Sequence, residues 1–121
     1  MERREFETLV GKALDGIPDE LYNFLDNVDV VVEDWPTPTQ LVVSDIEDGE
    51  YLLGLYEGIP LTARHEYGNV LPDKITIFQR SIEEVCDSKD EIIEQVRDTV
   101  VHEVAHHFGI DDERLHELGV A

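Results

Sequence analysis

The chain has 121 residues, 41% of them hydrophobic, so we expect one domain, residues 1–121, with a modest core. Its 29 acidic and 9 basic residues give a formal charge of −20, which would repel nucleic acid and anionic membranes. No apolar run approaches the roughly 20 residues that cross a bilayer, and no apolar segment follows the charged N-terminus. We therefore expect a cytoplasmic protein without a secretory signal.

Two short helices are expected at the N-terminus. Apolar residues recur at helical spacing within Glu2–Asp15, and Gly16 ends that pattern. Pro18 is suited to the first turn of a second helix, Pro18–Asn27. The two helices are expected to bury their apolar residues in the core, namely Phe6, Leu9, Val10, Ala13, Leu14, Leu21, Tyr22, Phe24 and Leu25.

The middle of the chain is expected to supply the strands. Composition indicates strands at Val28–Glu33, Tyr51–Tyr56 and Lys74–Phe78. Between the first two, Thr39–Val43 favours a short helix and Ser44–Glu50 an acidic loop. That loop lacks the ligand spacing of an EF-hand, so we interpret it as a solvated turn rather than a calcium site.

A long helix is expected towards the C-terminus. It follows a short helix at Ser81–Cys86 and begins after Ser88, which has the spacing of a capping box with Glu91. The helix is expected to run to about Phe108 and to end at Gly109. Glycine suits that position because it adopts the left-handed cap conformation without steric cost.

Successive residues of a helix are about 100° apart around its axis, which places the apolar residues of this helix on one side and two histidines on the other. His102 and His106 lie opposite the apolar arc, and Glu103 lies at its border. His107 falls inside the arc, so we expect it to be a hydrogen-bonded core histidine. The arc consists of Ile92, Ile93, Val96, Val100, Val101, Val104 and Phe108.

The sequence His102-Glu103-x-x-His106 is a zinc signature. Histidines four residues apart lie on one side of a helix, so both imidazoles can reach one metal ion. Glu103 then sits beside the metal, where it can take a proton from a metal-bound water. After the turn at Gly109, Asp112 arrives as a third ligand, which leaves the fourth tetrahedral position for water, as in a catalytic zinc site.

Three residues compete for the role of third ligand. Asp112 is favoured by its spacing after His106, but an aspartate at the start of the last expected helix, Asp111–Leu118, also suits a helix cap. Asp111 competes for both roles. His116 lies one helical turn past Asp112, and we expect it to contact a ligand residue or to line the cleft, with ligation in place of Asp112 as the alternative.

The pattern His102-Glu103-x-x-His106-x-x-Gly109-x-x-Asp112 resembles the metzincin-type zinc motif with Asp in place of the third His. No methionine follows Met1, so the Met-turn of the larger metzincins is absent. The flanking residues resemble the small bacterial minimal zincins, a metallopeptidase-like family. The similar segments are Leu52–Arg64, Tyr67-Gly68, Leu71–Asp73, Val100–Asp112 and Arg114–Gly119.

The expected elements form an α+β fold with a small three- to four-stranded mixed sheet on the long helix, completed by the N-terminal helices. The resemblance implies a zincin-like domain that binds Zn²⁺ and hydrolyses peptide bonds of a peptide or protein substrate. It also implies an edge strand that pairs with an extended peptide, for which Lys74–Phe78 is the candidate, and a role for Tyr67 at the oxyanion or the cleft. The alternatives are a metal-binding interaction or regulatory domain without peptidase activity and a small-amide hydrolase.

Overall fold

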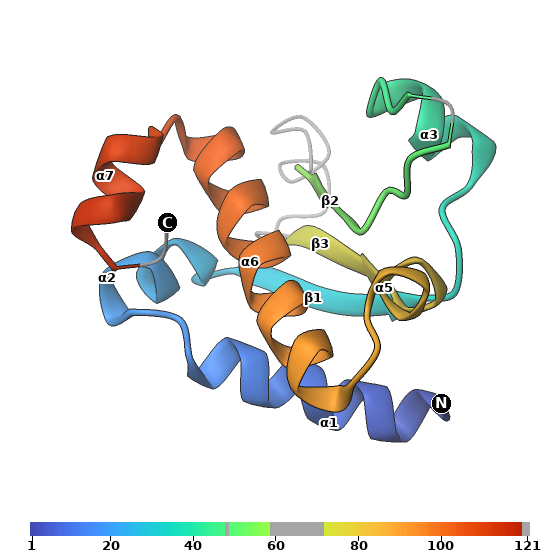
Figure 1. Ribbon diagram of the computed structural model, residues 1–121. Helices are drawn as coiled ribbons and strands as arrows, with labels where there is room; N and C mark the ends of the chain where they lie inside the picture. Colours follow the sequence, from blue (N-terminus) through green and yellow to red (C-terminus); the bar gives the residue numbers. More distant parts are fainter. Residues whose placement is uncertain (48, 59–71, 120–121) are drawn as a thin grey trace.

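The structure is a computed structural model that describes residues 1–47, 49–58 and 72–119. Helices and a three-stranded mixed sheet make up this part of the chain, so the expected α+β class is confirmed (Figure 1). Within the same residues, no helix combines the length and the apolar character needed to cross a bilayer.

The sheet contains β1 (Val28–Glu33), β2 (Gly54–Glu57) and β3 (Asp73–Phe78) in the order β1-β3-β2. The middle strand, β3, is parallel to β1 and antiparallel to β2. The prediction that Lys74–Phe78 is an edge strand is therefore wrong. Four consecutive residues of β3, Ile75 to Phe78, are buried, as expected of a strand covered on both faces. Among the described residues, β1 and β2 form the edges of the sheet.

Strand β2 begins later than predicted, at Gly54 instead of Tyr51, and ends one residue later, at Glu57. The short helix predicted between the first two strands is confirmed as α3 (Pro38–Val43). Thr37 caps it, because the Thr37 side chain accepts a hydrogen bond from the backbone N–H of Gln40 at 3.1 Å.

The N-terminal helix is confirmed as α1 (Arg3–Asp15). The second predicted helix, Pro18–Asn27, is split into α2 (Asp19–Tyr22) and a 3₁₀ turn, η1 (Asn23–Leu25). Asn27 has a left-handed backbone with φ of 59°, so the chain leaves the helical conformation just before β1.

The long helix, α6 (Lys89–Phe108), begins and ends as predicted. The side chain of Ser88 accepts a hydrogen bond from the backbone N–H of Glu91 at 3.1 Å. The carboxylate of Glu91 accepts one from the backbone N–H of Asp87 at 3.0 Å. Gly109 ends the helix with φ of 72°.

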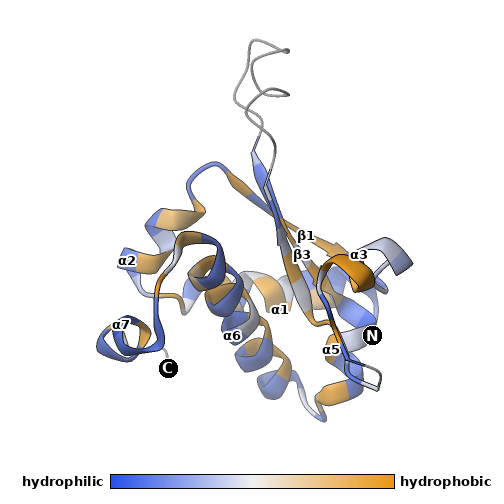
Figure 2. Cartoon of the chain, turned by 90° about the horizontal axis from the view of Figure 1, so that it is seen from above, coloured by the Kyte–Doolittle hydropathy of each residue, from blue (hydrophilic) through white to orange (hydrophobic). Residues whose placement is uncertain are grey.

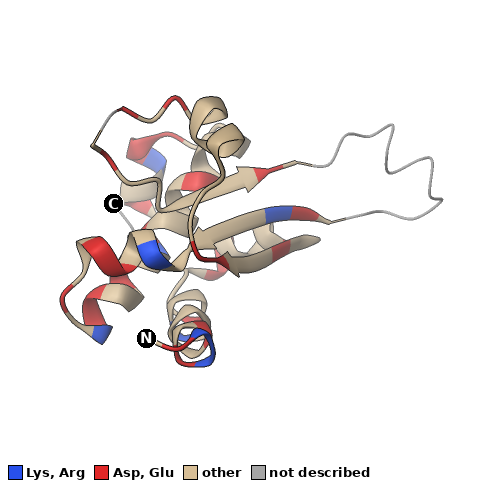
Figure 3. Ribbon diagram, turned by 90° about the vertical axis from the view of Figure 1, so that its right-hand side faces the viewer, with Lys and Arg blue, Asp and Glu red and all other residues tan. Residues whose placement is uncertain are grey.

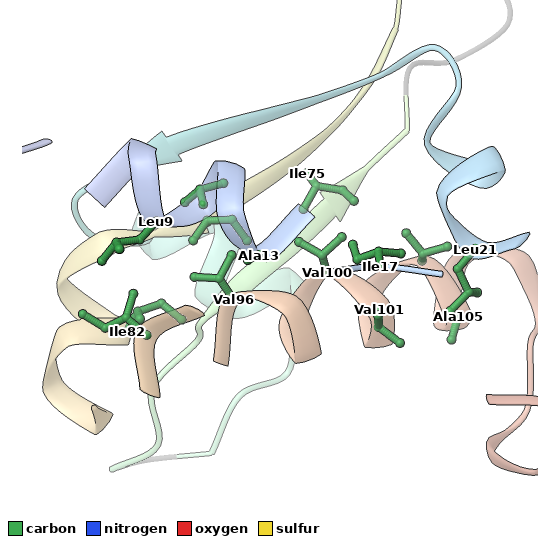
Figure 4. Packing of buried hydrophobic residues seen from close by; sticks show 14 of the residues in the cluster. Leu9, Ala13, Ile17, Leu21, Ile75, Ile82, Val96, Val100, Val101 and Ala105 are labelled. Atoms are coloured by element: carbon green, nitrogen blue, oxygen red, sulfur yellow. The ribbon is translucent and has the colours of Figure 1, made fainter. Parts of the chain in front are cut away.

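The core lies where α1, together with Ile17 and Leu21 that follow it, packs against α6 and β3 (Figure 4). Figure 2 shows hydrophobic and hydrophilic positions alternating along α6, as in an amphipathic helix. The apolar side of α6 supplies buried valine and alanine residues to this cluster. Its labelled members in Figure 4 are Leu9, Ala13, Ile17, Leu21, Ile75, Ile82, Val96, Val100, Val101 and Ala105.

The substitution Phe6→Ala should test this core, since Phe6 is 0% exposed. We expect it to lower the free energy of unfolding by about 3–5 kcal/mol, because it leaves a cavity between packed elements. Urea denaturation followed by circular dichroism measures the change. Val42→Ala is the control, because Val42 is 80% exposed and should change stability by less than about 0.5 kcal/mol. Equal effects of the two substitutions would contradict this packing.

A second prediction concerns Glu83 on α5 (Gln79–Val85), the helix that follows β3. Burial acts to raise the pKa of Glu83, but hydrogen bonds from the side chains of Gln79 and Arg80, at 3.1 and 2.9 Å, and the positive charges of Arg80 and the N-terminus together outweigh it, so its pKa is below the ordinary value. A carboxylate with a depressed folded-state pKa stabilises the protein above the unfolded pKa of about 4.3, and this contribution is lost as the pH falls through the folded-state value.

Glu83→Gln should therefore destabilise the protein by up to about 1 kcal/mol at neutral pH, and the difference from wild type should shrink in acid. Urea denaturation at several pH values measures it. Glu84→Gln is the control, because Glu84 is exposed. A difference that stays constant with pH would show that the charge of Glu83 does not stabilise the fold.

Candidate functional site

Three residues of α6 that are four apart, Thr99, Glu103 and His107, form a stripe that faces β2. A Cβ added to Gly54 would lie 2.6 Å from Cγ2 of Thr99, so strand and helix approach closely there. One turn later, Oε1 of Glu103 accepts a hydrogen bond from the backbone N–H of Tyr56 at 2.9 Å. At the next turn the rings of His107 and Tyr56 stack with centroids 3.9 Å apart. Strand β2 therefore runs along this stripe and holds Glu103.

The prediction that His107 is a buried core histidine is wrong, because its side chain is exposed. The helical wheel gave its direction correctly, since His107 faces the sheet side of α6. A wheel contains no information on depth along the axis, and the last turn of α6 extends past the core. There His107 and the partly exposed Phe108 form an aromatic group with Tyr56 and Phe24.

The neighbouring stripe of α6 contains His102 and His106, and both side chains are exposed. Their spacing places them on one side of the helix, about one turn apart. Asp98 precedes His102 by the same spacing on this stripe. Sequence reasoning missed Asp98, although its position four residues before the first histidine was a usable signal.

The turn after α6 directs the chain back beside the helix (Figure 1). It begins at the left-handed Gly109, and the backbone N–H of Ile110 then donates to the carbonyl of Ala105 at 2.8 Å. The next helix, α7 (Asp112–Glu117), is held to the core by Leu115, which is 1% exposed.

Asp111 is the capping residue of α7, since its Oδ1 accepts a hydrogen bond from the backbone N–H of Arg114 at 2.8 Å. Asp112 is the first residue within the helix. Of the two adjacent aspartates, the competing cap role therefore belongs to Asp111. Asp112 is among the residues that line the cleft described next.

A cleft of about 830 Å³ lies between α6 and α7. Its lining includes His102, Asp112 and His116, three of the residues selected from the sequence, whereas His106 is not among its lining residues. Tyr67 lies outside the described residues. The complete lining is Asp98, His102, Asp112, Glu113, His116 and Glu117.

The donor set fits zinc in kind, because imidazoles and a carboxylate are the ligands of catalytic zinc sites. Within residues 1–47, 49–58 and 72–119, no three His, Cys, Asp or Glu side chains form a group that could hold a metal ion. His102 and His106 are exposed, so their side chains can change rotamer without disturbing the core. The four carboxylates of the cleft would attract a cation, in keeping with the acidic residues spread over most elements in Figure 3.

A family model described as zincin-like metallopeptidase matches residues 25–120. The chain belongs to the zincin-like metallopeptidase family. Membership implies zinc binding in general and confirms the resemblance seen in the sequence. The match covers the sheet, α6 and α7, and thus every element that borders the cleft.

The zincin-like fold also has a counterpart among solved structures, a conserved hypothetical protein from T. thermophilus. The two are 25% identical, the alignment covers 89% of this chain and 94% of the other, and the TM-score is 0.58. A search of curated proteins gave no match. The similarity therefore supports the fold and carries no activity with it.

Gly54→Ala tests the close approach of β2 to α6. We expect a loss of about 1–3 kcal/mol in stability, because the new methyl group meets Cγ2 of Thr99, and urea denaturation measures it. The double variant with Thr99→Ser should recover part of the loss, since it removes that carbon. Gly11→Ala is the control, because nothing lies within 4 Å of its added Cβ and a helical position favours alanine. Full tolerance of Gly54→Ala would contradict the contact.

Proposed function

We propose that this zincin-like protein is a zinc-dependent metallopeptidase that hydrolyses peptide bonds through a metal-activated water. The observation that carries the proposal is the arrangement on α6. His102 and His106 are exposed on one stripe, Asp112 lines the same cleft as His102, and Glu103 projects from the adjacent stripe. Family membership supports this assignment of the motif.

The proposed roles follow from the chemistry of each side chain. His102, His106 and Asp112 would hold the metal, and zinc would supply a water of lowered pKa and a Lewis acid for the substrate carbonyl. Glu103 would accept the proton of the attacking water and deliver it to the leaving amine. His116 lines the cleft with Asp112 and is the alternative ligand.

The expected place of an extended peptide changes with the order of the strands. Since β3 is central, the edge strand that borders α6 and Glu103 is β2. The acidic residues around the cleft favour substrates with positive charge near the scissile bond. The charge of −20 argues against nucleic acid as a partner.

Metal content of the chain, purified without chelator or tag histidines, tests the centre. We expect near-stoichiometric zinc in the wild type and its loss in His102→Ala. Asp112→Asn should weaken zinc binding at least about tenfold, as expected for a lost ligand. Asp111→Asn is the matched control, since asparagine also caps a helix and the affinity should not change.

Two results would contradict this ligand set. Equal zinc affinity of Asp112→Asn and Asp111→Asn, with loss in His116→Ala, would move the third ligand to His116. Failure of the wild type to take up zinc on titration would remove the metal centre and the proposed reaction with it.

The role of Glu103 has its own test. Glu103→Gln should retain zinc and lose turnover by about 10²–10⁴-fold, because the amide cannot accept the proton. Hydrolysis of a panel of basic and acidic peptides, beside small amides, measures the activity. Loss of zinc in Glu103→Gln would show that the residue is a ligand and not the base.

A second candidate function is a metal-binding interaction or regulatory domain without peptidase activity. It is supported by the acidic surface and by α3, on which Val42 and Val43 are 80% and 72% exposed. Exposed apolar side chains beside acidic ones suit a basic partner with an apolar face. Zinc binding without hydrolysis of any peptide or small amide in the panel would favour this candidate, whereas cleavage of small amides alone would indicate a small-amide hydrolase.

A further inference from the structure

Tyr56 contacts the candidate site through three different groups. Its backbone N–H donates to Oε1 of Glu103 at 2.9 Å. Its ring stacks on His107, with an interplanar angle of 18°. Its hydroxyl donates to Oδ2 of Asp73, the first residue of β3, at 2.6 Å. Tyr56 therefore links the α6 stripe to the start of the central strand.

The geometry of the sheet explains why this N–H is available to Glu103. In an antiparallel pair, residues that bond to the partner strand alternate with residues whose backbone groups point away. The carbonyl of Leu53 accepts from the N–H of Phe78 at 3.0 Å, so Leu53 belongs to the first kind. Tyr56, three residues on and opposite Ile75, belongs to the second. Its N–H therefore points away from β3, towards α6.

We propose that Tyr56 is a positioning residue that fixes the carboxylate of Glu103 for proton transfer. The backbone N–H holds Oε1, while the ring and the hydroxyl fix the strand that carries the N–H. Oε2 is then left for the proton. The inference rests on the proposed role of Glu103 as the base, and it extends the site to a residue outside the zinc motif.

The need for such a device follows from the place of Glu103. Its side chain is only half-buried, and an unrestrained glutamate samples several rotamers. A general base must lie within hydrogen-bond reach of the proton, and misplacement by about 1 Å costs roughly 10²-fold in rate. A hydrogen bond from a strand that is itself fixed at two further points restricts the carboxylate to one region.

Hydrogen exchange of the Tyr56 amide in the metal-free full chain tests the contact without reference to activity. We expect strong protection in the wild type and in Glu103→Gln, whose side-chain oxygen can still accept, and at least about tenfold faster exchange in Glu103→Ala. The amide of Glu57, which faces β3, is the internal control and should not change. Equal protection of Tyr56 in Glu103→Gln and Glu103→Ala would overturn the inference.

Variants of Tyr56 separate its three contacts. Tyr56→Phe removes only the hydroxyl, Tyr56→Ala also removes the ring, and Tyr56→Pro removes the N–H as well. Proline is tolerated at this position because the Tyr56 N–H makes no hydrogen bond to β3, so its loss does not break the pairing of the two strands. The carboxyl ¹³C resonance of Glu103 in the metal-free chain should move towards that of an exposed glutamate in the order Phe, Ala, Pro. An unchanged resonance in Tyr56→Pro would overturn the inference.

The zinc-loaded enzyme provides the kinetic test. We expect kcat to fall about 10²-fold in Tyr56→Pro and less in Tyr56→Phe, because the placement of the base is altered. A rise in KM at constant kcat would overturn the positioning role. Absence of hydrolysis in the wild type would instead reject the proposed function, and the exchange experiment distinguishes the two failures because it needs neither zinc nor substrate.

Discussion

The contact between β2 and one stripe of α6 is the constraint on which the candidate site depends. Gly54 allows the strand to reach Thr99, because any larger residue would have its Cβ only 2.6 Å from the threonine methyl group. This approach brings the backbone of Tyr56 within hydrogen-bond distance of Glu103. Without it, Glu103 would be a solvated side chain on an amphipathic helix.

Three sides of helix α6 face different surroundings, and the residues on each side have similar spacing. Its buried valines pack against α1 and the sheet, the stripe with Glu103 follows β2, and the stripe with His102 and His106 is exposed, with His102 at the cleft. Since residues four apart lie on one side of a helix, the five-residue zinc signature distributes its members over two of these environments. The proposed base is thereby held by protein, whereas the proposed ligands remain accessible to a metal.

The position of α7, which forms one side of the cleft, depends on the turn after α6. The left-handed Gly109 reverses the chain, Asp111 caps α7, and Leu115 anchors it in the core. Because Asp111 caps α7, the carboxylate of Asp112 is not needed as a cap, and Asp112 lines the cleft. Helix α7 also contributes His116, Glu113 and Glu117 to the cleft, and the two glutamates make the surroundings of the proposed centre strongly acidic. Such a cleft would attract cations.

The sequence by itself determined the long helix with its limits, the β-branched strands, the α+β class and the family, because caps, glycine turns and periodicity are local signals. It also determined which side of α6 each histidine faces. Only the tertiary structure decided that β3 is central, that His107 is exposed against Tyr56, and that Tyr56 borders the candidate site. The physical reason is that strand order, depth in the core and contacts between distant segments depend on long-range packing, which spacing within a single element does not encode.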